Sequence, residues 1–270
     1  MVDDMVLGLV QMQSTRGDIP GNLARINSFC QKAQAHGVDL LCFPELSVTG
    51  YHGAAQLAQP LSGFIPQSLS RMARRYGLSI CAGFAETSAE GKPYLSHLLC
   101  TPEGQIFSYH KTHLGRRELE SFAPGDVLPV FKTPKAKVGI ALCLEAHYPE
   151  IASTLVLRGA EVLLYPFASP LAPRRRRESW SRTLSARAYD AGAYVGCCNA
   201  LGPCGDRARF SGGAMVFDPR GQVLAESFGE EGELTVASLP GQPLNRLREK
   251  GMSSMKEPFF LAGRRPELYR

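Results

Sequence analysis

Three side chains that could do chemistry stand where apolar runs of this 270-residue chain end. Glu45 follows the run 38–44, Lys111 closes an extended stretch, and Cys143 ends the run 138–143. The carboxyl ends of strands in an α/β sheet are where catalytic groups commonly lie. The three positions therefore predict a site that combines a carboxylate, a cation and a thiol.

Each residue type has a specific use in such a site. A carboxylate after a buried strand is partly desolvated, which raises its pKa towards that of a general base. A lysine stabilises an oxyanion or a thiolate. A cysteine in a strand-to-helix turn lies beside backbone N–H groups that lower its pKa. Ordinary roles stay open: Glu45 as a cap or ion-pair partner, Lys111 as a solvated lysine, Cys143 as one more buried cysteine.

Histidines add little to this interpretation. His110 and His113 are three residues apart with no cysteine or carboxylate cluster beside them, so we expect no metal site. His147 lies four residues after Cys143 and is a candidate base, although a cysteine–histidine pair does not require that spacing.

The rest of the sequence predicts the elements that must hold these side chains. Predicted strands span residues 6–10, 38–44, 78–84, 138–143, 162–166, 193–198 and 214–217. Predicted helices begin at an N-cap Asn22 and near residues 68 and 149, and another carries the apolar stripe Trp180, Leu184, Ala188 and Ala191. Residues 93–111 predict an antiparallel hairpin around the turn 101–105. The alternation favours one layered α/β domain over residues 1–270, with 244–270 as a less periodic tail.

Composition excludes several classes of protein. No apolar run of about 18 residues occurs, so no membrane-spanning helix is expected. The net charge of +5 is mild, and one basic run, 174–177, is not typical of a nucleic-acid binder. The eight cysteines lie mostly in apolar runs, as buried thiols do, and the N-terminus has no secretory pattern. We therefore expect a cytoplasmic protein without disulfides.

The order of the motifs is more specific than any one of them. The sequence resembles the carbon–nitrogen hydrolases of the nitrilase superfamily over nearly its whole length. The matching segments are 43–45 with 50–51, 111–114, Glu118 before 122–126, Cys143 with 149–150, 159–161, 165–166, Trp180, 187–188, Asn199, 210–213, 218–221 and 264–269.

This resemblance implies a four-layer α-β-β-α sandwich and a Glu-Lys-Cys triad. Glu45 would be the general base, Lys111 the oxyanion stabiliser and Cys143 the nucleophile. Glu118 would be a second, positioning carboxylate, with Glu120 as its rival. The resemblance also implies a homodimer or larger homo-oligomer, in which the tail 244–270 packs at a subunit interface.

The implied reaction proceeds through a thioester acyl-enzyme and needs no cofactor or metal. The oxyanion would be held by Lys111 and the backbone N–H of Leu144. Three further positions, Tyr51, His147 and Phe167, are expected to contact a small-molecule substrate.

The substrate is less well specified. At the position of Leu144 many relatives carry an aromatic or polar residue. At that of Glu145 many amidase-like members carry Asp, whereas nitrilases often carry Glu, usually within Cys-Trp-Glu and in longer chains. The resemblance therefore favours the amidase-like branch, acting on a linear amide or an N-carbamoyl compound, over a nitrilase. An acyltransferase and a non-catalytic binding protein on the same fold are further alternatives. The run 174–177 is expected in a loop that borders the pocket. There Arg174 or Arg175 could bind a substrate carboxylate bidentately, or the run could be a solvated surface loop.

Overall fold

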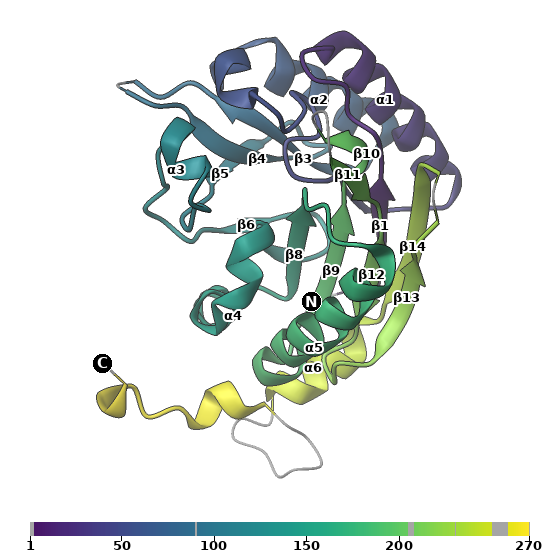
Figure 1. The fold of residues 1–270 in the computed structure, drawn as a ribbon. Coiled ribbons are helices and arrows are strands. Elements are labelled where there is room, and N and C mark those ends of the chain that lie inside the picture. The colour runs from purple at the N-terminus through teal and green to yellow at the C-terminus, as the bar shows by residue number, and fades with distance from the viewer. Residues whose placement is uncertain (1–2, 90, 205–207, 230, 250–258, 270) are drawn as a thin grey trace.

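Two six-stranded sheets form the centre of the protein, and helices cover their outer faces (Figure 1). The computed structural model describes residues 3–89, 91–204, 208–229, 231–249 and 259–269. The resulting α-β-β-α sandwich is the predicted fold class, and it is confirmed. Within the described residues, no helix is long and apolar enough to cross a membrane.

The first sheet carries the strands that lead to Glu45 and Lys111. Its parallel centre continues into an antiparallel edge, as the predicted hairpin requires. Its strands, in spatial order, are β14 (Glu233–Leu239), β1 (Met5–Gln11), β2 (Leu40–Cys42), β3 (Ser79–Glu86), β4 (Tyr94–Cys100) and β5 (Ile106–His110).

The second sheet leads to Cys143. Strands β7, β8 and β9 are parallel, and the others are antiparallel to their neighbours. Its strands, in spatial order, are β13 (Val223–Ser227), β12 (Ala214–Phe217), β9 (Tyr194–Asn199), β8 (Val162–Phe167), β7 (Lys137–Ile140) and β6 (Val130–Lys132). A separate hairpin pairs β10 (Leu201–Cys204) with β11 (Ala208–Ser211).

Three apolar clusters hold the layers together. The central cluster joins the facing sides of the two sheets, for example Leu7 and Leu40 with Val162 and Ile140. The two outer clusters pack helices on the sheets: α1 (Ile19–Ala35) and α2 (Phe64–Tyr76) on the first, α4 (Pro149–Leu157) and α5 (Pro173–Ala191) on the second. Because each sheet is covered on both faces, its central strands are apolar throughout, which explains why they were readily predicted.

Three sequence predictions are wrong at element boundaries. Helix α1 begins at Ile19, and its N-cap is Asp18, which accepts a hydrogen bond from the Gly21 N–H at 3.0 Å. Asn22 is a buried residue inside the helix. Its side chain donates to the carbonyls of Thr15 (2.7 Å) and Val48 (2.9 Å), so it fixes the loop that follows Glu45.

The second wrong boundary concerns the run 174–177, which lies in the first turns of α5 and not in a loop. The third concerns the predicted tail. Helix α6 (Gly241–Glu249) packs on the domain, and its Arg248 donates to the Ala160 carbonyl at 2.7 Å. Residues 250–258 of that segment lie outside the described residues. Beyond them are the short 3₁₀ helices Phe260–Gly263 and Pro266–Leu268.

Candidate active site

The turn after β2 presents Glu45 to the space between the sheets. Leu46 adopts a left-handed conformation with φ 53°, which reverses the chain within two residues of the strand-terminating Pro44. Gly83 on β3 permits this, because a Cβ there would lie 2.4 Å from the Leu46 nitrogen. The Val48 N–H then donates to the Gly83 carbonyl at 2.9 Å and holds the turn against the sheet. Glu45 is 2 % exposed.

Lys111 follows β5 and points inward. Its N–H donates to the Leu95 carbonyl, and its own carbonyl accepts from the Gly125 N–H, each at 2.9 Å. The ammonium group donates to Glu45 Oε1 at 2.7 Å and to Glu118 Oε1 at 2.8 Å. With the side chain buried, these two carboxylates are the groups that offset its desolvation.

Glu118 opens the short helix α3 (Glu118–Ser121) and is also fixed from the other side. Its Oε2 accepts from the Gly115 N–H at 2.6 Å, and its Oε1 accepts from the Tyr51 hydroxyl at 2.8 Å. The rival carboxylate Glu120 is exposed. The structure thus brings Glu118, and not Glu120, to Lys111.

Cys143 stands at the end of the loop after β7 and begins the 3₁₀ helix Cys143–His147. Its φ of 46° lies in the left-handed region, which costs a non-glycine residue on the order of 1 kcal/mol. Of the eight cysteines, all free, only Cys143 and Cys204 are partly exposed, and six are buried as expected. Strained backbone at a partly exposed nucleophile is a common feature of functional sites.

The charges of these groups depend on their burial. Burial raises the pKa of Glu45 to about 7 against the opposing effect of Lys111. Burial also acts to raise the pKa of Glu118, but Lys111 and the other donors bring it below its ordinary value. For Lys111, the neighbouring carboxylates outweigh burial and raise its pKa. Burial and the Glu45 charge raise the pKa of the Cys143 thiol to about 12, while Lys111 lowers it.

Glu145 has a role that the sequence did not reveal. It is fully buried, and its Oε1 accepts from the Tyr109 hydroxyl (2.7 Å), from the hydroxyl and N–H of Thr112 (2.6 and 2.9 Å) and from the His113 N–H (3.1 Å). Its Oε2 accepts from the Leu142 N–H at 2.6 Å. One carboxylate therefore joins the segment after Lys111 to the residue before Cys143. The signal available in the sequence was a lone acidic residue two positions after the cysteine.

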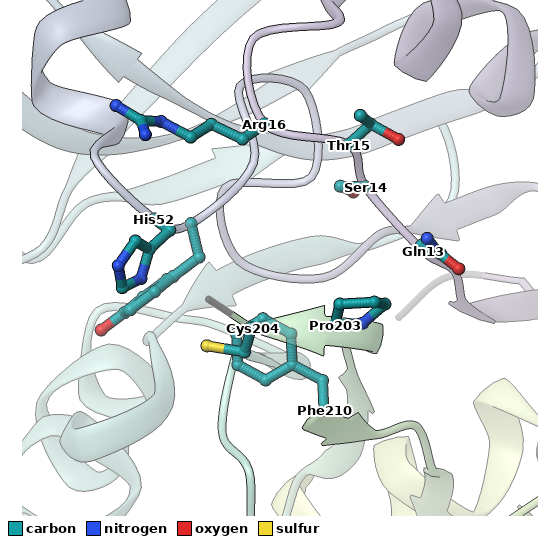
Figure 2. Close-up of a pocket in the computed structure, with 9 residues that line it drawn as sticks. Gln13, Ser14, Thr15, Arg16, His52, Pro203, Cys204 and Phe210 are labelled. Atoms are coloured by element: carbon teal, nitrogen blue, oxygen red, sulfur yellow. The ribbon is translucent and has the colours of Figure 1, made fainter. Parts of the chain in front are cut away.

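Two adjoining hollows lie beside this cluster. One, of about 570 Å³, is lined by Tyr51 and Glu118 together with Phe210 of β11. The other, of about 390 Å³, lies between the segment Gln13, Ser14, Thr15 and Arg16 after β1 and the hairpin residues Cys204 and Phe210 (Figure 2). Tyr51 and Phe210 line both hollows and meet edge to face at 5.9 Å between ring centroids. These rings form the boundary between the two spaces.

The other residues predicted for the site differ in how close they lie to this cluster and in how exposed they are. Tyr51 contacts the cluster by donating a hydrogen bond to Glu118. Leu144, which follows Cys143 in the chain, is partly exposed. His147 is exposed at the end of the 3₁₀ helix. Phe167 is 2 % exposed and packs on Trp180 at 5.1 Å.

The predicted carboxylate-binding arginines are both exposed on α5. Arg174 pairs with Glu178 at 3.1 Å, one helical turn away, and Arg175 lies beside it on the exposed surface. The buried member of the run is Arg176, which the sequence did not distinguish from its neighbours.

Fold and site together define a class of protein: an α-β-β-α sandwich in which a carboxylate and a lysine follow strands of one sheet and a cysteine follows a strand of the other. The sequence model of the carbon-nitrogen hydrolase family matches residues 6–248. The chain belongs to this family, within the nitrilase superfamily, as its sequence predicted.

Known relatives agree with this assignment. An (R)-stereoselective amidase from Pseudomonas sp is 35% identical over 233 residues, covering 84% of this chain and 82% of the relative. A protein named nitrilase from Pyrococcus abyssi is 30% identical over 270 residues, covering 96% of this chain and 97% of the relative. The solved structure of an amidase from Nesterenkonia sp. AN1 in complex with acrylamide has a TM-score of 0.82 and 25% identity, covering 98% of this chain and 96% of that one.

Proposed function

We propose that this protein hydrolyses the C–N bond of a small linear amide through a thioester on Cys143. The observation that supports this best is the buried Lys111 ammonium, which is held between Glu45 and Glu118. The amidase names among the relatives support an amide as the substrate.

Glu45 is the general base. Its Oε1 is engaged by Lys111, and its buried Oε2 has no partner among the described residues, so it is free to accept a proton. A pKa of about 7 suits a base that works near neutral pH. The thiol pKa of about 12 lies far above this, so proton transfer is favourable only when it is coupled to attack of sulfur on the substrate carbon.

The chemistry then balances in two steps. Sulfur bonds to the carbonyl carbon, Glu45 takes the thiol proton, and the oxyanion is stabilised by Lys111 and the Leu144 N–H, each donor contributing roughly 2.7–4 kcal/mol in acyl transfer. The C–N bond breaks as Glu45 returns the proton to nitrogen, and ammonia leaves. Water, deprotonated by Glu45, hydrolyses the thioester and restores the thiol.

A matched substrate panel tests the reaction class. One carbon skeleton is offered as butyramide, butyronitrile and the N-carbamoyl derivative of propylamine, and ammonia release is measured with the parent protein and with Cys143→Ala. Release from the amide or the carbamoyl compound, lost in the variant, is the expected result. Ammonia release mainly from the nitrile would contradict the amidase proposal and indicate a nitrilase. The nitrile is included because one relative is named a nitrilase. Undiminished release by Cys143→Ala would contradict the mechanism.

Addition of hydroxylamine to the same assay tests the acyltransferase alternative. Water is the expected acceptor, so the carboxylic acid should remain the main product at low hydroxylamine concentrations. Dominant hydroxamate formation under those conditions would favour acyl transfer to an amine.

We also propose that the chain acts as a homodimer or larger homo-oligomer. Large apolar side chains are exposed at the two ends of α4, where Tyr148 is the N-cap, and in the C-terminal segment. They are Tyr148, Leu157, Phe260, Leu268 and Tyr269. Sedimentation of the parent protein tests this directly, and a monomer at micromolar concentration would refute it.

A further inference from the structure

Arg176 occupies a position on α5 that an apolar residue would be expected to fill. The buried face of this helix carries Trp180, Leu184 and Ala188 at intervals of four residues, and Arg176 continues the stripe one turn towards the N-terminus. Its side chain lies under the surface, with the residue only 5 % exposed. A buried guanidinium needs compensating interactions, because its desolvation is costly.

Two aromatic rings lie beside this guanidinium, and two of its nitrogens have no acceptor among the described residues. Its Cζ lies 5.2 Å from the ring centroid of Phe167 and 5.3 Å from that of Trp180, which is cation–π geometry. Nε and Nη2 of Arg176 are buried and have no hydrogen-bond partner among the described residues. The adjacent Trp180 Nε1 is also buried, and it too has no partner within the described ranges. Two contacting side chains thus carry three buried donors with no acceptor in the part of the chain that the structure describes, whereas the neighbouring Arg177 forms an ion pair with Glu226.

This donor cluster lies at the catalytic end of the second sheet. Phe167 is the last residue of β8, and β8 runs parallel to β7, which leads to Cys143. Cys143 packs against the same apolar cluster that contains Phe167 and Trp180. Burial lowers the pKa of Arg176, and the charge of the Cys143 thiolate acts in the opposite direction.

Two occupants would satisfy these donors: the thiolate of Cys143 or an anionic group on the substrate. No hydrogen bond joins Arg176 to Cys143 in the described part of the chain, and Lys111 already provides the thiolate with a cation. The Nε and Nη2 edge of an arginine matches the two oxygens of a carboxylate, and it is a poorer match for one sulfur. Because Nε and Nη2 make no hydrogen bond to any described residue, reorienting this edge of the guanidinium towards a carboxylate breaks none of the described bonds.

We infer that Arg176 binds the carboxylate of the substrate, so that the preferred substrates are monoamides of dicarboxylic acids. This inference rests on the proposed amide hydrolysis at Cys143. In the reaction, the monoamide and one water give a dicarboxylate and ammonium, with the remote carboxylate unchanged. Arg176 is here a specificity-determining residue, and it takes no part in proton transfer.

Binding tests the inference without any turnover. Titration calorimetry compares succinamate with butyramide, which replaces the carboxylate by a methyl group, on protein carrying Cys143→Ala. Succinamate should bind at least tenfold more tightly, and adding Arg176→Gln should reduce this preference about tenfold to a hundredfold, as expected for charge-assisted hydrogen bonds. Arg175→Gln, on the exposed neighbour, is the matched control and should keep the preference. Equal binding of the two ligands, or a preference that survives Arg176→Gln, would overturn the inference.

Turnover separates this inference from the proposed function. With Cys143 intact, the ratio of kcat/KM for succinamate to that for butyramide should fall at least tenfold in Arg176→Gln and less in Arg176→Lys. An equal loss on both substrates, with slower alkylation of Cys143 by iodoacetamide, would assign Arg176 to the thiolate instead. Tight, Arg176-dependent binding of succinamate without ammonia release would refute the hydrolysis and leave the carboxylate site intact.

Discussion

Glu145 provides a severe test of how this fold positions its catalytic residues. Glu145→Gln removes one oxygen and the charge. If the amide oxygen replaces Oε1, the amide nitrogen faces the Leu142 N–H, so one hydrogen bond of 2.6 Å is replaced by two opposed donors. The reverse orientation is worse, since four donors converge on Oε1. The first orientation is therefore expected.

The cost follows from these contacts. A hydrogen bond to a charged group contributes about 1.5–3 kcal/mol and one to a neutral group about 0.5–1.5 kcal/mol. One bond is lost and the others lose their charge assistance, so the free energy of unfolding should fall by about 2–4 kcal/mol. Glu145→Ala removes every one of these hydrogen bonds and should cost more than Glu145→Gln, because each buried donor left without an acceptor costs about 1–3 kcal/mol.

Activity should fall for a different reason than stability. The carboxylate joins the segment after Lys111 to the residue before Cys143, so its loss loosens the spacing of cation and thiol. A displacement of about 1 Å costs on the order of 100-fold in rate. We expect kcat to fall by about that factor in Glu145→Gln, with KM within threefold of the parent value, because the hollow itself is unchanged.

Urea unfolding and steady-state ammonia release measure the two effects. Glu150→Gln is the matched control, because Glu150 is an exposed glutamate in the first turn of α4, and it should change stability by less than about 1 kcal/mol. A Glu145→Gln protein with parental stability and kcat would refute the reasoning. A rise in KM with unchanged kcat would mean that Glu145 shapes the substrate site and does not hold the catalytic spacing.

Four further predictions follow from the burial of single groups. Because Glu45 must be ionised to act, kcat/KM for a neutral amide should rise with pH through about 7, and a profile that is flat from pH 5 to 8 would exclude Glu45 as the base. Glu118→Gln should lower kcat at least tenfold and the exposed Glu120→Gln less than twofold, and the reverse order in the ammonia assay would exchange their roles. Burial lowers the pKa of His97 to about 3, so between pH 6.5 and 3 only the unfolded chain takes up a proton at this residue. The free energy of unfolding should therefore fall by about 1.4 kcal/mol per pH unit below pH 6.5. Denaturant unfolding should show a smaller loss of stability between pH 7 and pH 5 for His97→Gln than for the parent protein. Arg176→Met removes a buried charge that has no ion-pair partner among the residues described, and it should raise the free energy of unfolding by about 1–3 kcal/mol. A loss of stability would show that the ring contacts of Arg176 outweigh its desolvation.

Much of the fold could be predicted because its strands are buried on both faces. Strands β2, β7 and β8 lie in continuous apolar segments bounded by turns, and such a pattern is typical of a strand that is buried on both faces. Local capping was less well determined. Asp18 and Asn22 are both good N-caps, and the choice depends on the contact between Asn22 and the loop near Val48, which is remote in sequence.

The site was predicted in part for a similar reason. Glu45, Lys111 and Cys143 are marked by strand ends, and their order identifies the family. The role of Glu145 depends on a segment more than 30 residues away, and no local pattern indicates that contact. In the run 174–177, only the helical phase set by Trp180 separates the buried Arg176 from its exposed neighbours. The sequence pattern favours a loop for this run, and a loop has no helical phase.

The most direct test of the central claim is the mass of the protein caught during turnover. The parent protein is mixed with butyramide, quenched in acid within milliseconds to seconds, and analysed intact and as peptides. We predict a butyryl adduct on the peptide that contains Cys143, formed at a rate no slower than kcat and absent from Cys143→Ala. Ammonia release without any adduct, continuing in Cys143→Ala, would contradict the account.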